Sequence, residues 1–296
     1  MNEGDGRHMK DLLAKAEVLT EALPYIKRTS GKKVVIKYGG AAMTDPKLRE
    51  QVASDIVLMK LVGINPVIVH GGGPEITSYM ERLDMKVEFF NGLRVTTDEA
   101  MELVRMVLVG KVNPELVGAI NVHGRYAVGV SGDDGNLVTA KQRDPRLGRV
   151  GDVTAIDTTI IDKLIEDDFI PVVATVAAGE DGGSYNVNAD SVASELAVAL
   201  DADKVIFLTD VDGLYADFED PASLISALTP DEAEEMIVND LLGGGMVPKV
   251  AACVAALRGG VRRAHILNGT VPHALLLEVY TDEGVGTMIA ETGEEL

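Results

Sequence analysis

The sequence predicts an α/β fold, a three-layer αβα sandwich in which helices cover both faces of a largely parallel central sheet. The apolar run 34–36 leads into Lys37 and the glycine pair 39–40, and the apolar run 66–70 leads into glycines 71–73. Short β-branched runs are typical of buried strands, and glycine turns let the backbone approach a ligand closely. Because ligands of open α/β folds bind at the carboxyl ends of strands, the two turns predict an anion cradle there.

The third observation is that a helix signal follows each of these strands. Asp45-Pro46 offers a capping acid and a first-turn proline to a helix that runs to about Val62, and Pro74 opens the next helix directly after the second glycine turn. This order predicts parallel strands joined by right-handed crossovers.

Ahead of the first strand, apolar residues recur at helical spacing and predict one helix that Pro24 bends or ends. The stripe contains Leu12, Ala16, Leu19, Leu23 and Ile26. It packs either on its own domain or, as an arm, against another subunit.

Later elements follow from the same patterns. Asn91-Gly92 predicts a hairpin turn after a short strand at 86–90, and Thr97 or Asp98 begins a long helix to about Val122 that bends at Asn113-Pro114. Residues 132–148 predict an exposed loop or hairpin. The remaining strands are expected at 125–131, 149–156, 169–176, 204–208, 263–267 and 286–289, and helices at 158–167, 190–200, 230–238 and 246–257. Three parts are expected: a tail and helical arm (1–28), an N-lobe (29–180) and a C-lobe (181–296), with one continuous sheet as an alternative to separable lobes.

Composition excludes several classes of function. The 27 basic and 47 acidic residues give a formal charge of −20, which argues against binding to a phosphate backbone. Aromatic residues make up only 4%, which argues against recognition of single-stranded nucleic acid by stacking. No nucleic-acid partner is therefore expected. Because Cys253 is the single cysteine, an intramolecular disulfide is excluded, which fits a cytoplasmic protein. Cys253 lies in an apolar run, which favours a position in the core. Neither a membrane-spanning run nor a signal-peptide core is present in the sequence, so no membrane partner is expected.

The candidate chemistry is phosphoryl transfer, although the P-loop motif and the glycine fingerprint of dinucleotide binding are both missing. Lys37 and Lys249, which stands beside glycines 243–245, could surround a phosphoryl group together with the glycine turns. Taken alone, either lysine is equally well explained as an ordinary surface residue.

Six ordered motifs resemble the amino acid kinase family, and within it the branch that phosphorylates N-acetyl-L-glutamate. They are VVIKYGG (34–40), VHGGGPEI (69–76), NGLRVT (91–96), YNVNAD (185–190), LTDVDGLY (208–215) and GGGMVPKV (243–250). The resemblance spans about residues 10–290 and implies the amino acid kinase fold. It also implies ATP-dependent phosphorylation of the γ-carboxylate in arginine biosynthesis, with Mg²⁺ bound through ATP and no direct protein ligand to the metal. In this scheme the N-lobe binds acetylglutamate and forms a dimer, and the C-lobe binds ATP.

The resemblance also implies roles for individual residues. Lys37 and Lys249 would neutralise the transferring phosphoryl group, and Asp190 would orient both lysines. Because the nucleophile is a carboxylate, no general base is needed, and His70 and His123 are expected to be structural. Substrate contacts would come from Gly72, Gly73, Arg94, Asn186 and Asn188, and ATP contacts from Gly39, Gly40, Thr209, Asp210 and Lys249.

Arginine-sensitive members of the family carry an N-terminal helix that ends near a tyrosine and interlaces dimers into a hexamer. The stretch Leu23-Pro24-Tyr25-Ile26 resembles this ending. Leu214-Tyr215-Ala216 departs from the family pattern, which often has a basic residue there, and leaves the effector's carboxylate without an assigned contact. The implied effector residues are Tyr25, His265, Glu278 and Gly284.

Two rival functions stay open from the sequence. One is a kinase of the same family that acts on carrier-protein-linked aminoadipate or glutamate, and the other is a non-catalytic arginine or nucleotide sensor. The joint presence of Lys37, Lys249 and Asp190 speaks against the sensor. Some family members also bind a nitrogen-signalling protein, on which the sequence does not bear.

Overall fold

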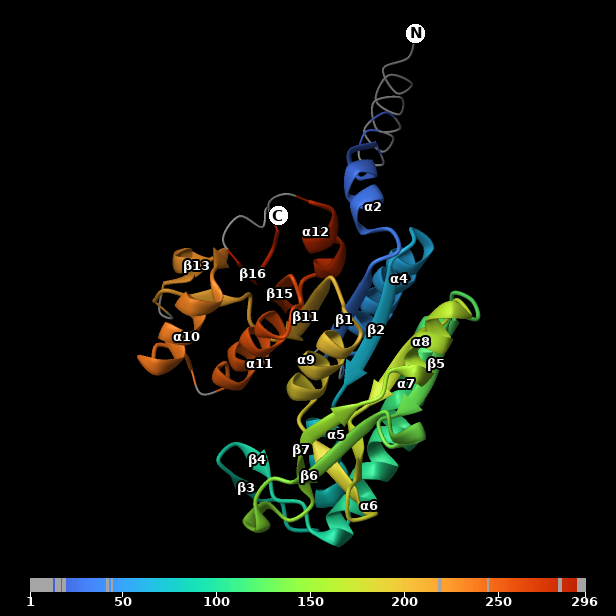
Figure 1. The fold of residues 1–296 in the computed structure, drawn as a ribbon, viewed down its shortest axis with the longest axis vertical. Coiled ribbons are helices and arrows are strands. Elements are labelled where there is room, and N and C mark those ends of the chain that lie inside the picture. Colours follow the sequence, from blue (N-terminus) through green and yellow to red (C-terminus); the bar gives the residue numbers. More distant parts are fainter. Residues whose placement is uncertain are drawn as a thin grey trace.

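The computed structural model describes residues 13, 17, 20–40, 43, 45–217, 220–243, 245–281 and 284–291. Within these residues an eight-stranded sheet has the order β14-β16-β15-β11-β1-β2-β8-β5 (Figure 1). Neighbouring strands are parallel except β15 and β16, which confirms the largely parallel sheet. The strands are β1 (Lys33–Tyr38), β2 (Asn65–His70), β5 (Ala127–Ser131), β8 (Ile170–Ala174), β11 (Lys204–Thr209), β14 (Ala227–Leu228), β15 (Arg263–Asn268) and β16 (Thr287–Ala290).

Helices cover both faces of this sheet and make the predicted three layers. Successive side chains of a strand point to opposite faces, so Val35 packs into one apolar core while Val34 and Ile36 pack into the other. The core around Val35 includes α8 (Thr159–Glu166), α9 (Ala189–Ala199), α10 (Pro230–Val238) and α11 (Val247–Arg258). The core around Val34 includes α4 (Pro46–Leu61), α5 (Gly73–Arg82), α6 (Asp98–Val107), α7 (Asn113–Asn121) and α12 (Ala274–Tyr280).

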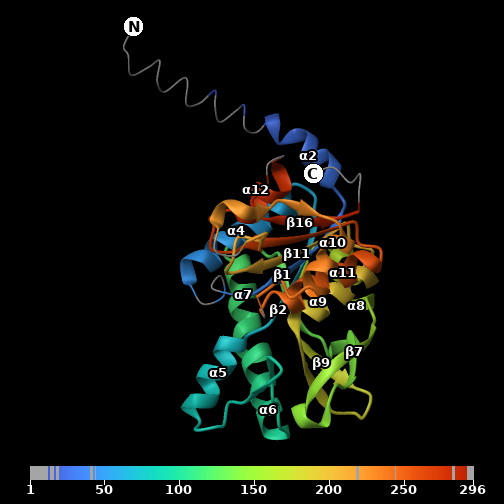
Figure 2. The same cartoon turned by 90° about the vertical axis from the view of Figure 1, so that its left-hand side faces the viewer.

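A small closed barrel continues from the carboxyl end of β8. Its strands are β6 (Val138–Gln142), β7 (Val150–Ile156), β9 (Val176–Gly179) and β10 (Ser184–Val187), and Figure 2 shows β7 and β9 below the central sheet. The expected single strand 169–176 is wrong, because the chain leaves the central sheet after Ala174. The hairpin alternative for 132–148 is right and the exposed loop is wrong, because Leu137, Val138 and Ala140 are buried in the core.

The hairpin at Asn91-Gly92 is confirmed, with both residues at positive φ. Its strands, β3 (Phe89–Phe90) and β4 (Leu93–Arg94), are shorter than expected. The long helix begins with Thr97 as its cap, and its irregularity is a π-helical turn, η1 (Leu108–Val112), directly before Asn113. The remaining short elements are η2 (Asp134–Asn136), η3 (Pro145–Leu147), β12 (Leu214–Tyr215), η4 (Pro221–Ser223) and β13 (Leu224–Ile225).

The N-terminal helix α2 (Leu23–Thr29) lies beside α12. The helical stretch is interrupted by a turn at Ala22, and Pro24 lies in the first turn of α2, so the interruption predicted near Pro24 is present. The helix ends at Thr29, three residues beyond the predicted end at Ile26. The predicted stripe residues Leu12, Ala16 and Leu19 lie outside the described residues. None of the helices in the described ranges is both long and apolar enough to cross a membrane.

Candidate active site

A cavity of about 320 Å³ opens at the carboxyl ends of β1 and β2, bordered by the β3–β4 hairpin and by β10. It brings together all of the predicted catalytic and substrate residues and three of the five predicted ATP contacts. Thr209 and Asp210 are not in its lining; Thr209 is the last residue of β11 and Asp210 follows it and abuts Gly40. The predicted residues in the lining are Lys37, Gly39, Gly40, Gly72, Gly73, Arg94, Asn186, Asn188, Asp190 and Lys249.

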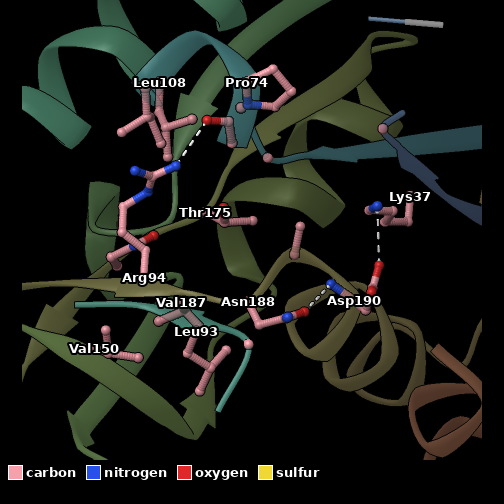
Figure 3. Close-up of a pocket in the computed structure, with 18 of the residues that line it drawn as sticks. Lys37, Pro74, Leu93, Arg94, Leu108, Val150, Thr175, Val187, Asn188 and Asp190 are labelled. Carbon is pink, nitrogen blue, oxygen red and sulfur yellow. Dashed lines mark hydrogen bonds and ion pairs between the residues drawn. The ribbon is translucent and has the colours of Figure 1, made fainter. Parts of the chain in front are cut away.

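Lys37, Asp190 and Lys249 form a triad on one side of the cavity, in which Lys37 and Asp190 are buried and Lys249 is half-buried. Alternation along β1 places Lys37 on the same face as Val35, where α9 packs. The Lys37 ammonium lies 3.1 Å from Oδ1 of Asp190, and the Lys249 ammonium, from the first turn of α11, lies 3.2 Å from Oδ2. Figure 3 shows the first of these pairs. The carboxylate therefore holds two cations side by side.

The charges of the triad depend on one another. Burial raises the pKa of the Asp190 carboxyl, but the ammonium groups of Lys37 and Lys249 outweigh burial and hold that pKa below its usual range. Burial lowers the pKa of Lys37, and Asp190 opposes this effect. With both lysines protonated, the triad has one net positive charge in a site of reduced solvent access, which suits an anionic ligand.

The two glycine turns shape the floor of the cavity. Gly40 has φ +70°, and a Cβ there would collide with the Asp210 carboxylate, so this position requires glycine. A Cβ on Gly72 would lie 2.6 Å from Leu108 of the π-helical turn. Gly73 begins α5, and a helix N-terminus favours anions through its free backbone N–H groups.

His70 supports the second turn from below. Asn113 donates from Nδ2 to His70 Nε2 (3.0 Å) and to the Val172 carbonyl (2.9 Å), so the ring proton is on Nδ1, which donates to the Gly71 carbonyl at 2.9 Å. Burial lowers the pKa of His70 to about 4. A neutral, fully enclosed ring fits the structural role expected for it.

We expect His70→Gln to reduce the acid sensitivity of the fold. The pKa of His70 is about 4 in the folded protein against 6.5 ordinarily, so the neutral ring contributes stability above pH 6.5 that is lost as the pH falls toward 4. Between pH 6.5 and 5 the unmodified protein should lose about 2 kcal/mol more free energy of unfolding than the variant. Urea unfolding of both proteins across this range measures the difference, and parallel pH curves would contradict the assignment.

Arg94 lies on the side of the cavity opposite the triad, as Figure 3 shows. Its guanidinium donates to the Gly73 carbonyl (3.0 Å) and to the Thr77 hydroxyl (2.6 Å), and it lies 4.9 Å from the centroid of the Phe89 ring. Burial lowers its pKa, yet no carboxylate among the described residues forms an ion pair with it. A buried, fixed guanidinium without an acidic partner is suited to a ligand carboxylate.

The two asparagines between these charged groups differ in their contacts. Asn186 donates from Nδ2 to the Thr96 hydroxyl at 3.3 Å. Asn188 caps α9, since its Oδ1 accepts from the backbone N–H groups of Asp190 (2.7 Å) and Ser191 (3.3 Å). Asn188 therefore caps a helix and also lines the cavity. The apolar part of the lining comes from Leu93, Leu108, Val150 and Val187.

The predicted effector residues meet elsewhere in the fold. The His265 ring lies 2.6 Å from Oε1 of Glu278, whose Oε2 accepts from the Val285 N–H and abuts Gly284. Burial lowers the pKa of His265, so the neutral ring donates to a charged carboxylate. Tyr25 is in α2, which lies beside the helix that carries Glu278.

Sequence reasoning missed Lys204 in this second cluster. It is the first residue of β11 and pairs in register with Arg263 on β15. Burial, and then the charge of Arg263, lower the pKa of Lys204 to about 8, while Glu278 acts in the opposite direction. Within the described ranges no carboxylate lies at ion-pair distance from its ammonium. A lysine at the start of an otherwise apolar strand was the signal that could have found it.

Two further groups bear on chemistry. In the part of the chain that the structure describes, no cluster of three or more His, Cys, Asp or Glu side chains could hold a metal ion. Cys253 is buried in the α11 core, and burial raises the pKa of its thiol well above the ordinary value. This thiol is therefore a core group.

Comparisons with known proteins agree with this geometry. The profile of the amino acid kinase family matches residues 32–268. The chain is 52% identical to an acetylglutamate kinase of Heliobacterium modesticaldum over 95% of this chain and 99% of that protein. It is 53% identical to an acetylglutamate kinase of Syntrophomonas wolfei over 94% and 97%, respectively. Among solved structures, an N-acetylglutamate synthase from Neisseria gonorrhoeae in complex with coenzyme A and N-acetyl-glutamate superposes with a TM-score of 0.83 at 25% identity, over 94% of this chain and 64% of that chain.

Proposed function

We propose that this chain, which belongs to the amino acid kinase family, transfers the γ-phosphoryl group of ATP to the γ-carboxylate of N-acetyl-L-glutamate, a step of arginine biosynthesis. The observation that carries the proposal is the placement of Arg94 on one side of a cavity and of the Lys37–Asp190–Lys249 triad on the other. Two separated cationic groups suit a dicarboxylate held at both ends. Acetylglutamate kinases at more than 50% identity support the choice of this dicarboxylate.

In the proposed reaction, Arg94 binds the α-carboxylate and the apolar lining accepts the acetyl methyl group. The γ-carboxylate oxygen attacks the γ-phosphorus of ATP, the bond to the bridging oxygen breaks, and N-acetyl-L-glutamyl 5-phosphate and ADP leave. Lys37 and Lys249 stabilise the charge that spreads over the transferring phosphoryl oxygens. Asp190 keeps both ammonium groups in place.

ATP would lie toward the end of β11, where Thr209 and Asp210 stand beside the Gly39-Gly40 turn. Mg²⁺ carried by the ATP phosphates would neutralise their charge, in keeping with the expectation that the protein holds no metal directly. We propose that the protein is located in the cytoplasm, where the reducing environment fits its single, buried Cys253.

An assay of ADP release, with trapping of the acyl phosphate as a hydroxamate, tests the proposal. We expect Mg²⁺-dependent turnover with N-acetylglutamate and little with glutamate, aspartate or carrier-protein-linked aminoadipate. Turnover only with the carrier-linked substrate would assign the chain to that sibling kinase. Binding of ATP or arginine without turnover on any of these carboxylates would favour the sensor.

We further propose that arginine inhibits the enzyme at the His265–Glu278 cluster. Its guanidinium or amino group would meet the buried Glu278 carboxylate, and Lys204 supplies the basic group for its carboxylate that the family pattern left unassigned. We further propose that the α2 helix, with Tyr25, joins dimers into a hexamer; Leu23, in its first turn, is exposed and available for such a contact. Light scattering of the full chain distinguishes the dimer from the hexamer.

Glu278→Gln is expected to raise the arginine concentration for half-inhibition by about 10- to 100-fold, because a charge-assisted contact is lost while the Gln oxygen still accepts from Val285. Basal turnover should be unchanged, since Glu278 does not line the cavity. Glu235→Gln, on an exposed position of α10, is the matched control. Equal inhibition of the variant and the unmodified enzyme would exclude this site, and an enzyme insensitive to arginine would exclude the inhibition itself.

A further inference from the structure

Arg149 lies where two walls of the cavity meet, although its side chain is outside the lining. Its backbone N–H donates to the Thr96 carbonyl at 2.6 Å, and its carbonyl accepts from the Asn186 N–H at 2.9 Å. Thr96 is two residues from Arg94 in sequence. The backbone of Arg149 therefore lies between the segment with Arg94 and the strand with Asn186.

The Arg149 side chain joins the same two walls a second time. Nε donates to Oδ1 of Asp98, the first residue of α6, at 2.5 Å, and Nη1 donates to Oδ2 of Asp181, in the turn between β9 and β10, at 2.7 Å. The guanidinium lies 5.5 Å from the centroid of the Tyr185 ring, and the Tyr185 hydroxyl donates to the same Asp181 oxygen at 3.1 Å. One planar group thus links α6 to the β9–β10 turn and to β10.

These contacts have little value as general stabilisation. The Arg149 side chain is 30% exposed and that of Asp98 is 84% exposed, and such pairs add little to the free energy of folding. Arg105 of α6 also pairs with Asp133 at 3.0 Å, so the helix keeps another ionic contact with the barrel side if Arg149 is removed. The only side-chain bond described between the Thr96 segment and Asn186 is the long one of 3.3 Å.

The hydrogen bonds to Asp98 and then to Asp181 raise the pKa of Arg149. The Gly183 N–H and then Arg149 lower the pKa of Asp181. Arg149 and Asp181 are therefore charged together. Lysine could keep the charge, but its single ammonium lacks the rigid fork that reaches two acids on different elements.

We propose that Arg149 is a positioning residue that fixes the distance between the Arg94 wall and the Asn186 wall, and so sets the affinity for the dicarboxylate. This inference rests on the proposed function, in which those walls grip the substrate. Loss of the Arg149 side chain widens the spacing that one substrate must bridge with both carboxylates, whereas the triad and the nucleotide loop are left in place.

Steady-state kinetics of Arg149→Ala and Arg149→Lys test the inference. For Arg149→Ala we expect KM for N-acetylglutamate to rise about 10-fold, with kcat and KM for ATP within about 3-fold of the unmodified enzyme. Arg149→Lys should reverse less than half of the rise in log KM for N-acetylglutamate that Arg149→Ala causes. Arg143→Ala is the matched control, because Arg143 pairs with Asp152 at 3.1 Å across the same barrel and contacts neither wall. It should leave all three constants unchanged.

Three outcomes would overturn the inference: an unchanged KM for N-acetylglutamate, a full rescue by lysine, or a parallel rise of both KM values with a fall in melting temperature. The last would mean a merely structural role. The unmodified enzyme is measured first in the same assay. Its failure to phosphorylate N-acetylglutamate would refute the proposed function and the inference with it, whereas normal turnover with unaffected variants would refute only the role of Arg149.

Discussion

Replacing Lys37 with alanine is expected to lower kcat with N-acetylglutamate by about 10³-fold, because a fixed cation next to the transferring phosphoryl group is lost. The effect should fall mainly on kcat, since the charge in question develops in the transition state. The fold should survive, because Lys249 remains 3.2 Å from the Asp190 carboxylate and keeps it paired. Single-turnover measurements with saturating ATP report the chemical step directly.

Lys33→Ala is the matched control for this variant. Lys33 begins the same strand at the end remote from the cavity, where it pairs with Asp162 at 2.8 Å. Its removal should leave kcat within about 2-fold of the value for the unmodified enzyme, because the Lys33 ammonium is remote from the transferring phosphoryl group and does not stabilise its charge. Near-normal turnover of Lys37→Ala, with circular dichroism and melting temperature preserved, would exclude a catalytic role for Lys37.

Replacing Arg94 with lysine is expected to raise KM for N-acetylglutamate by about 100-fold while KM for ATP stays the same. The substitution keeps the charge but loses the planar fork that Gly73 and Thr77 hold in position. Arg82→Lys, at the exposed end of α5, makes the same exchange outside the cavity and serves as the control.

A substrate without the α-carboxylate sharpens this test. The unmodified enzyme should use 4-acetamidobutyrate much less efficiently than N-acetylglutamate, by about 100-fold or more in kcat/KM. Arg94→Lys should narrow that ratio, because it removes the group that distinguishes the two compounds. If Arg94→Lys lowers kcat/KM equally for N-acetylglutamate and 4-acetamidobutyrate, Arg94 supports the cavity without contacting the α-carboxylate.

Much of the fold follows from local patterns. The apolar runs of β1 and β2, the Asp45 cap and first-turn proline of α4, the Thr97 cap of α6 and the turn at Asn91-Gly92 are all short-range signals, and the structure confirms them. The short helix α12 was not predicted. It has seven residues, no side-chain cap and a left-handed residue, His273, before it, so its stability comes from packing on its neighbours.

The strand break at Thr175 shows a different limit. The run 169–176 is apolar except for Thr175, and a β-branched threonine is common inside strands, so the pattern does not mark the point where the chain passes from β8 to β9. That point is decided by which strands are available as partners, namely β2 and β5 for β8, and β6 and β10 for β9. Strand pairing is a contact between distant residues, and it overrides local preference.

The features of the candidate site also fall into two groups: those that local sequence patterns predict and those that only the tertiary structure brings together. By itself the sequence determined that Lys37 and Gly39-Gly40 stand at the end of a buried strand, that glycines 71–73 follow another, and that the cations must act locally in a chain of charge −20. The family resemblance implied that Asp190 orients Lys37 and Lys249, and the structure gives the two ion pairs. Only the tertiary structure decided that Lys204 joins the His265–Glu278 cluster and that Arg149 ties two walls together. The physical reason is that glycine turns and strand periodicity act over a few residues. Charge pairing and burial depend on side chains brought together from distant parts of the chain.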